Sequence, residues 1–424
     1  MRPHYPIATH RLDNGLRVVV STDHSVPTVA VNIWVGVGSR HERPGRTGLA
    51  HLFEHLMFQG SENVVEGEHF AALLAQGAQL NATTWVDRTN YFEVVPTGAL
   101  ELALWLEADR QGRLLPALTQ ENLDNQRDVV KEEKRQRYDN VPYGTAFAEL
   151  TALVFPDGHP YHHTTIGSME DLDAASLTDA RDFYSAHYRP DNTVVTLVGD
   201  IEPDDGFALV AKYFDELTNP GQPPGQALAD PLPPMTDPGR FERTDDVPSD
   251  RLYLGFRLPV GGTQDFVHAD LGFDVLAGLA TSRLYRRLVR RDQLVTHVSR
   301  NAGARVDGTS MGALILDLSD GVETSRVEDT VGEELLRLAA EPPTESEVAA
   351  VVADVERWWL QSLAQPGERA DVISGSTLLY DDPEHLNTYL DDVAKVTAED
   401  IAKSAATHLD PASAATVVYR KETK

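Results

Sequence analysis

The segment His51-Leu52-Phe53-Glu54-His55 contains the residues of this chain whose types and spacing best suit chemistry. Residues four apart on an α-helix lie on one face, so His51 and His55 can direct two imidazoles at one point. Two imidazoles and a carboxylate are ligands that a catalytic zinc ion takes from a protein, leaving a position for water. Glu54 borders the same face and could take a proton from that water. The spacing H-x-x-E-H inverts the commoner H-E-x-x-H signature and predicts a metallopeptidase.

The surrounding residues predict that this motif lies on a helix of residues 47–60. The turn-forming residues 45–48 precede it, and Thr47 is a suitable N-cap. An apolar stripe at helical spacing follows, made of Leu49, Leu52, Phe53 and Leu56. The structural alternative is a pair of core histidines satisfied by backbone hydrogen bonds; a glutamate between two histidines favours the metal site.

The third zinc ligand must come from another segment, and the best source is the charged stretch of residues 126–136. This stretch is predicted to form a long helix with Val129 and Val130 directed inward. Glu132 and Glu133 are adjacent and point about 100° apart, so only one of them can face the metal helix. Composition does not choose between them, and a solvated charged face is the alternative for both.

With these two motifs the chain resembles the inverted zincins of the pitrilysin and mitochondrial processing peptidase type. The resemblance covers essentially the whole chain and is strongest from Thr9 to Gly167. Residues 48–61 match the metal helix of that family nearly residue for residue, and residues 126–133 match its second signature.

The resemblance assigns roles to individual residues. In the second signature, the glutamate three positions after the paired valines is the third ligand. That implies zinc ligands His51, His55 and Glu133, with Glu54 as general base. Similar proteins often carry a further glutamate where this chain has Gln126. Gln126 is therefore expected to support the site by donating a hydrogen bond instead of balancing charge.

Residues 79–95 are predicted to form a strand, a turn and a second strand. In similar proteins the strand that carries an Asn-Ala pair is an edge strand beside the metal, and an exposed edge can bind an extended peptide as an added strand. The resemblance thus implies that Asn81 and Ala82 contact substrate through their main chain. The residues alone would favour an ordinary hairpin.

The C-terminal half departs from the family pattern. In similar proteins it provides an arginine and, seven residues later, a tyrosine that hold the substrate and its developing oxyanion. The two matching positions here are Val289 and Thr296. Either neighbours such as Arg290 and His297 substitute, or a second chain supplies this clamp. We therefore expect a dimer, in particular a heterodimer with a metal-less related subunit; a homodimer is the alternative.

Composition limits the class of protein. The 424-residue chain has no cysteine, which excludes disulfides and thiolate metal ligands. Its first residues lack the apolar region of a signal peptide, and no apolar run of about 18 residues occurs, so we predict a cytoplasmic protein that does not span a membrane. The net charge of −29 disfavours nucleic acid and anionic membranes as partners and would attract basic peptides, although acidity also serves solubility.

Length and patterning predict two domains. A stretch rich in proline and glycine, residues 219–240, is predicted to link a metal-binding domain of residues 1–218 to a domain of residues 241–424 that lacks the motif. Both halves show the same order of predicted elements, which suggests a duplicated α+β unit. The resemblance implies two α/β roll domains, each an antiparallel-rich sheet packed by helices, facing each other across a chamber.

The individual elements follow from periodicity. Strands are predicted at residues 16–21, 28–37, 192–199, 251–258, 294–303, 309–318 and 414–419. Helices are predicted, besides those named above, at residues 65–76, 98–112, 143–154, 178–187, 203–217, 264–279, 281–291, 323–340, 343–365 and 397–408.

Together these observations predict a zinc-dependent endopeptidase that hydrolyses short or unfolded peptides, each bound as an added β-strand. The alternative is a non-catalytic assembly subunit of a larger complex, a role that some relatives have. Such subunits usually lose metal ligands, whereas this chain keeps the predicted ligands and the base.

Overall fold

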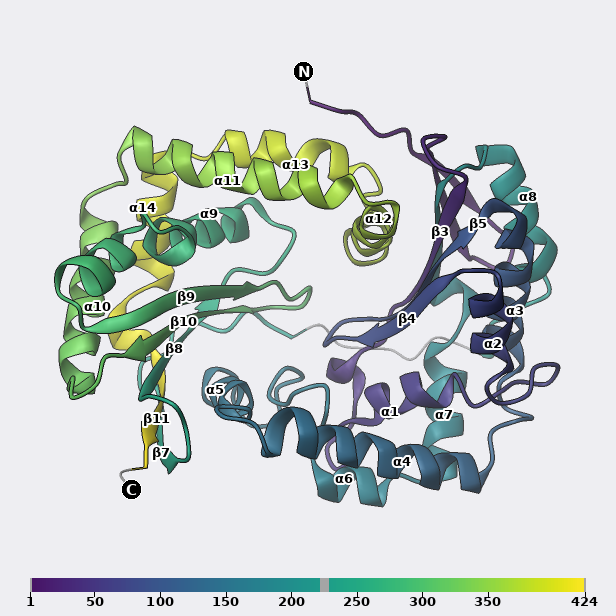
Figure 1. Cartoon of the computed structure of the whole chain (residues 1–424), viewed down its shortest axis with the longest axis horizontal. Helices are drawn as coiled ribbons and strands as arrows, with labels where there is room; N and C mark the ends of the chain where they lie inside the picture. Colours follow the sequence, from purple (N-terminus) through teal and green to yellow (C-terminus); the bar gives the residue numbers. More distant parts are fainter. Residues whose placement is uncertain (1, 222–228, 423–424) are drawn as a thin grey trace. The chain divides into compact units, whose positions relative to one another are not determined.

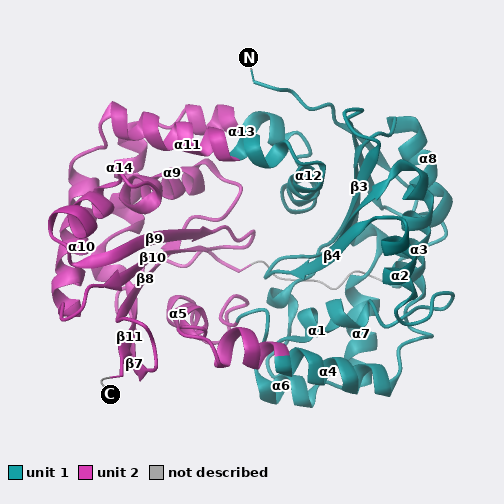
Figure 2. Ribbon diagram, in the orientation of Figure 1, with its two compact units in different colours: residues 1–132, 164–226, 359–389 teal, residues 133–163, 227–358, 390–424 magenta. Residues whose placement is uncertain are grey.

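The computed structural model describes residues 2–221 and 229–422 of the chain. They form two compact units, each assembled from separate stretches (Figure 2). Unit 1 comprises residues 1–132, 164–226 and 359–389, and unit 2 comprises residues 133–163, 227–358 and 390–424. Each unit contains one sheet packed by helices, which confirms the predicted α+β class. The consecutive domains 1–218 and 241–424 stay a prediction.

The sheet of unit 1, which includes β3, β4 and β5 (Figure 1), is mainly antiparallel. Its one parallel pair is β2 and β6. Its strands, in spatial order, are β1 (Ala8–Arg11), β2 (Arg17–Thr22), β6 (Thr193–Gly199), β3 (Thr28–Val35), β5 (Thr89–Pro96) and β4 (Gln79–Thr84). The hairpin predicted over residues 79–95 is thus present, and β4 is an edge strand.

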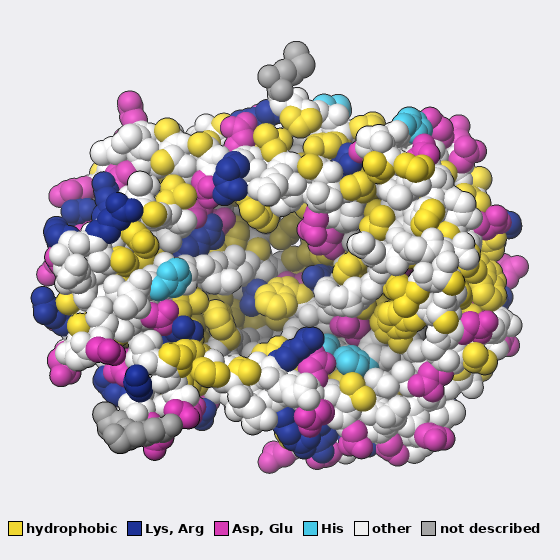
Figure 3. Space-filling view, viewed as in Figure 1, with side chains coloured by type: hydrophobic (Ala, Val, Ile, Leu, Met, Phe, Trp, Pro, Cys, Tyr) yellow, Lys and Arg dark blue, Asp and Glu magenta, His cyan; other side chains and the backbone are white. Residues whose placement is uncertain are grey.

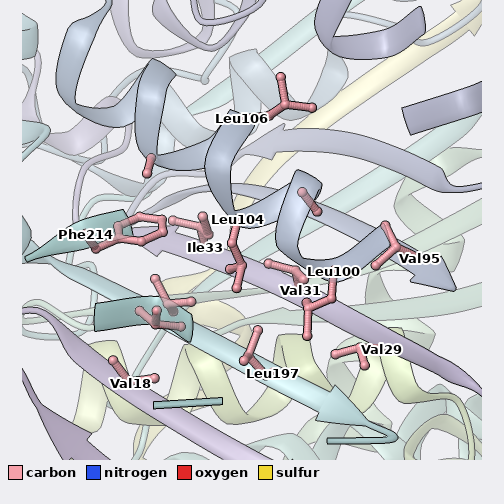
Figure 4. Packing of buried hydrophobic residues seen from close by; sticks show 14 of the residues in the cluster. Val18, Val29, Val31, Ile33, Val95, Leu100, Leu104, Leu106, Leu197 and Phe214 are labelled. Atoms are coloured by element: carbon pink, nitrogen blue, oxygen red, sulfur yellow. The ribbon is translucent and has the colours of Figure 1, made fainter. Parts of the chain in front are cut away.

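One face of this sheet holds the hydrophobic core of unit 1. Alternate residues of a strand point to the same face, so Val29, Val31 and Ile33 of β3 pack together toward Leu100 and Leu104 (Figure 4). The helices on this face are α2 (Glu68–Ala75), α3 (Leu100–Arg113) and α8 (Pro203–Phe214). On the other face, α12 (Pro366–Tyr380) packs against β3 and β6.

The helix with the histidine motif, α1 (Leu49–Leu56), contacts β4, β5 and α7 (Leu177–His187). It is shorter than the predicted 47–60, and Thr47 is not its N-cap. Gly48 is the N-cap residue, with φ +88°. The carboxylate of Glu42 accepts hydrogen bonds from the N–H groups of Gly48 and Ala50. The Thr47 hydroxyl instead donates to Asp171, at the start of α6 (Met169–Ala174).

Unit 2 repeats the strand order of unit 1. Its strands, in spatial order, are β7 (Arg240–Asp245), β11 (Ala415–Lys421), β8 (Arg251–Leu258), β10 (Ser310–Leu318) and β9 (Val295–Gly303). This matches β2-β6-β3-β5-β4 in space and along the chain, including the parallel first pair. The helix α5 (Ala146–Val154) packs against β8 and β11, as α12 packs against β3 and β6. The topology therefore supports the predicted duplication.

The remaining helices complete the chain: α4 (Gln120–Lys134), α9 (Gln264–Phe273), α10 (Thr324–Ala340), α11 (Glu345–Leu363), α13 (His385–Ala394) and α14 (Ala398–His408). The predictions omitted the helices α6, α12 and α13 and the strands β1 and β7. Of the predicted linker, residues 222–228 lie outside the described residues, residues 229–239 form no helix or strand, and β7 begins at Arg240. No helix among the described residues is long and apolar enough to cross a membrane.

Candidate metal centre

The helix α1 presents both histidines on one side because its apolar residues hold the other side in the core. Leu52, Phe53 and Leu56 are fully buried, whereas His51, Glu54 and His55 are half-buried. The ring centroids of His51 and His55 are 4.9 Å apart. The i,i+4 spacing therefore brings the two imidazoles together as expected.

A carboxylate from a distant segment joins the two histidines. The ligand atoms of His51, His55 and Glu133 lie within 4.8 Å of one another. Glu133 is in the last turn of α4, which runs unbroken through the boundary between the compact units at residue 132. Its neighbour Glu132 is exposed and is not part of the cluster. The structure thus brings Glu133, and not Glu132, to the two histidines, and Arg137 pairs with its Oε1 at 2.6 Å.

Gln126 lies two turns before Glu133 on the same helix and is 8% exposed. Its Oε1 is 3.3 Å from His55 Nδ1. Because an amide oxygen only accepts, His55 Nδ1–H is the donor, and this tautomer leaves the Nε2 lone pair for a metal. Gln126 therefore accepts a hydrogen bond from His55, where the sequence led us to expect a donor, and its support of a metal site stays a prediction.

Glu54 is oriented by Thr84, a residue that no motif of the sequence indicated. Thr84, the last residue of β4, donates from Oγ1 to Glu54 Oε2 at 2.5 Å. Its register partner Thr89 lies 3.5 Å away between hydroxyl oxygens, and Thr89 donates to the Val37 carbonyl at 2.8 Å. The only signal in the sequence was that Thr84 ends the strand that carries Asn81.

The free edge of β4 is formed by alternate residues. The Trp85 N–H donates to the Arg88 carbonyl across the hairpin. Since backbone groups alternate in direction along a strand, Ala82 and Thr84 direct theirs away from β5. The Ala82 N–H accordingly bonds to the Asn81 side chain, at 2.9 Å to Oδ1. Ala82 thus directs its backbone groups toward the free edge, as expected for a main-chain contact with substrate. In this structure the side-chain oxygen of Asn81 accepts the Ala82 N–H.

Arg88, on the turn after β4, brings positive charge close to Glu54. Burial lowers the pKa of its guanidinium, whereas the charges of Asp371, Glu54 and Asp87 act in the opposite direction. Its Nη1 donates to Thr83 and Asn90, and its guanidinium lies 4.8 Å from the Trp34 ring. These contacts fix the Arg88 side chain on the face of the sheet that α12 covers.

A second group with metal-ligand chemistry lies in the core of unit 1. His69, Glu93 and Glu107 are buried, with ligand atoms within 4.8 Å of one another. Arg110 donates from Nε to Glu107 at 2.9 Å, and burial raises the pKa of Glu93 well above its ordinary value. The cation that neutralises this group is therefore the Arg110 guanidinium.

The two positions where similar proteins have a substrate clamp lie in unit 2. Val289 is half-buried in a π-helical segment, Tyr285–Arg291, and Thr296 is exposed on β9. Arg290 stacks on Tyr285, and His297 is exposed beside Thr296. The substrate-holding role of this region stays a prediction.

Comparisons with known proteins match both halves of the chain to the same peptidase family. A family model described as "Insulinase (Peptidase family M16)" matches residues 17–159, and one described as "Peptidase M16 inactive domain" matches residues 174–354. The zinc protease PqqE of Helicobacter pylori is 34% identical over 67% of this chain and 64% of its own length, so less than two thirds of that relative is spanned.

Two further proteins are similar. The crystal structure of a protease from Helicobacter pylori has a TM-score of 0.91 and 25% identity, covering 99% of this chain and 100% of that one. The mitochondrial cytochrome b-c1 complex subunit 1 of Bos taurus is 30% identical over 49% of this chain and 42% of its own length. With both signatures present and both halves matched, the chain belongs to peptidase family M16.

Proposed function

We propose that this chain is a zinc-dependent endopeptidase that hydrolyses short or unfolded peptides bound along β4. One observation carries the proposal: two imidazoles from α1 and one carboxylate from α4 converge within 4.8 Å, although Glu133 is 78 residues beyond His55 in the sequence. Membership of a peptidase family and similarity to proteins named zinc proteases support it.

The donor set fits zinc. Two nitrogens and one oxygen are the ligands of several catalytic zinc sites, and the Gln126 contact gives His55 the tautomer that a ligand needs. Bound by His51, His55 and Glu133, zinc would lower the pKa of a water molecule to about 7 and polarise a peptide carbonyl.

The residues of the chain itself supply proton transfer and positioning. Glu54 is outside the ligand cluster, and its carboxylate accepts a hydrogen bond from the Thr84 hydroxyl. As general base it takes a proton from the attacking water and passes it to the leaving nitrogen. The β4 edge at Ala82 pairs with the substrate backbone, so that the peptide lies extended beside Glu54.

The substitution Glu54→Gln tests the mechanism. The variant is expected to bind zinc as the wild type does and to lose peptide hydrolysis by about a hundredfold or more, because only the base is removed. Zinc content by mass spectrometry and turnover of casein or a fluorogenic peptide are the measurements. Near-normal turnover by this variant would contradict the proposal.

A non-catalytic assembly subunit is the second candidate. The similarity to the cytochrome b-c1 complex subunit and the match to an inactive-domain model favour it. The two candidates differ in the purified protein: a peptidase cleaves peptides in a chelator-sensitive way, whereas an assembly subunit cleaves none.

We also propose that a related chain completes the substrate site, because Val289 and Thr296 replace the expected clamp residues. Pull-down from the native source and assay of the purified single chain address this point. Full activity of the single chain would remove the heterodimer and leave Arg290 and His297 as the residues to test.

A further inference from the structure

A cavity of about 870 Å³ lies within unit 1, on the face of the sheet opposite the hydrophobic core. The strands β3, β4 and β5 and the first turns of α12 line it. Phe92, Val94 and Pro366 give it apolar walls, and Asn81 lies at the β4 side. None of its lining residues belongs to the His51–His55–Glu133 cluster.

An added strand on β4 would direct half of its side chains toward this cavity. Side chains alternate between the faces of a sheet, and those directly opposite on neighbouring strands lie side by side. On β4, Asn81 and Thr83 line the cavity, whereas Thr84 faces Glu54. A peptide paired with β4 therefore sends alternate side chains to the metal side and to the cavity side.

The cavity offers two carboxylates from one face of α12, Glu368 and Asp371, three residues apart. Asp371 Oδ1 accepts from Asn32, Trp34 and Asn90 at 3.1, 3.0 and 2.9 Å, whereas Oδ2 accepts no hydrogen bond from the described residues. The exposed Glu368 side chain has no hydrogen bond or ion pair among the described residues.

One cationic residue, Arg88, also lines the cavity, but its guanidinium already contacts other residues of the sheet. Its Nη1 donates to the Thr83 carbonyl at 2.9 Å and to Asn90 Oδ1 at 3.2 Å, and its charge stacks on Trp34. The first turn of α12 adds partial positive charge, which Glu368 offsets. Two carboxylates against one arginine still leave the cavity with an excess of negative charge.

Net charge alone does not locate such a site. Acidic side chains are scattered over the face of the molecule shown in Figure 3 and do not gather in one patch. The cavity differs because acidic groups and apolar side chains line it together. That arrangement suits a side chain with a long methylene stem and a cationic head.

We propose that this cavity is a subsite for a lysine or arginine side chain of the peptide that pairs with β4. The stem packs beside Asn81 and Thr83 toward Phe92, and the cationic head pairs with Glu368. Asp371, which bonds to β3 and β5, adds negative charge farther across the sheet. This inference rests on the proposed peptidase function, because it needs a peptide bound along β4.

The test uses binding without turnover. In the full-length, zinc-loaded Glu54→Gln protein, the affinity is measured by fluorescence anisotropy for otherwise neutral extended peptides that carry one lysine at successive positions. The expected result is one position with a clear maximum. Adding Glu368→Lys lowers that maximum on the order of tenfold and strengthens binding of a peptide with glutamate at this position.

Glu121→Lys is the matched control, since Glu121 is also exposed in the first turn of a helix of unit 1 but lies outside the cavity. It is expected to leave the position profile unchanged. Equal profiles for the Glu368→Lys and Glu121→Lys proteins, or tighter binding of leucine than lysine at the peak position, would overturn the subsite. Wild-type protein that binds with the expected profile but cleaves nothing would instead refute the peptidase function and leave the subsite standing.

Discussion

The two units share a strand order, but the helical segments at one corresponding place in that order carry side chains of different chemistry. In unit 1, α1 lies between β3 and β4 in the chain and carries His51 and His55 four residues apart. In unit 2, the helical segment between β8 and β9 carries Asp270 and Asp274, again four residues apart. The shared strand order thus presents a pair of side chains one turn apart in each unit.

The edge strands complete the contrast. In unit 1, Thr84 of β4 contacts Glu54, and the two imidazoles retain ring nitrogens that can bind a metal. In unit 2, Arg300 of β9 pairs with Asp270 at 2.5 Å and with Asp274 at 2.7 Å. An internal cation therefore neutralises the pair in unit 2. The fold alone does not determine whether such a position binds a metal; the residues placed on it do.

The largest expected effect is removal of the third ligand in unit 1. Glu133→Gln should weaken zinc binding by more than about a hundredfold, because it removes a direct ligand and not an outer partner. Glu132→Gln, one residue earlier and exposed, is the matched control and should bind zinc as the wild type does. Isothermal titration with zinc distinguishes them. Equal zinc affinities in the two variants would mean that Glu133 is not a ligand.

A smaller effect should appear in the pH dependence of stability, from the cluster in unit 2. Burial raises the pKa of Asp274 from 3.8 to about 6, with Asp270 and Asp354 adding to the shift and Arg300 opposing it. The folded protein therefore retains a proton that the unfolded chain has released. This contribution to the free energy of unfolding is fully present below pH 3.8 and falls as the pH rises through about 6.

Asp274→Asn removes that titration. Between about pH 4 and pH 7, the free energy of unfolding of the wild type should fall by up to about 3 kcal/mol more than that of the variant. Urea unfolding at several pH values measures the difference. A variant with the same pH dependence as the wild type would show that Asp274 titrates normally.

The smallest effect concerns the contact from the edge strand in unit 1. Thr84→Val keeps the shape of the side chain but cannot donate to Glu54, so kcat should fall on the order of tenfold while zinc content is unchanged. Thr84→Ser retains a hydroxyl and should restore most of kcat. If valine and serine behave alike, the hydroxyl has no positioning role.

The sequence predicted the elements whose periodicity is strong. The helices at residues 65–76, 178–187 and 323–340 were predicted to within a few residues, because each has one buried stripe. The helix α12 was missed because its sequence lacks that pattern. It contains Gly375, where a side chain would meet the Trp34 ring at 2.9 Å, and small polar residues that are buried against the sheet, including Ser374 and Ser376.

The residues of the candidate site likewise differ in how far the sequence alone could predict them. The spacing of His51 and His55 is local, so helix geometry alone predicted that they meet. The choice of Glu133 over Glu132 depended on which carboxylate of α4 lies near the two histidines, and the residues alone left it open. Thr84 and Asp371 depend on register and on contacts between segments distant in sequence, which one sequence does not contain.

The most direct test of the metal centre is a crystal structure of the zinc-loaded protein with anomalous scattering recorded at the zinc edge. We expect one strong peak bound by a nitrogen of His51, a nitrogen of His55 and a carboxylate oxygen of Glu133, at about 2.0–2.2 Å from each. A zinc-loaded crystal without a peak at this position, or with Glu133 directed into solvent, would contradict it.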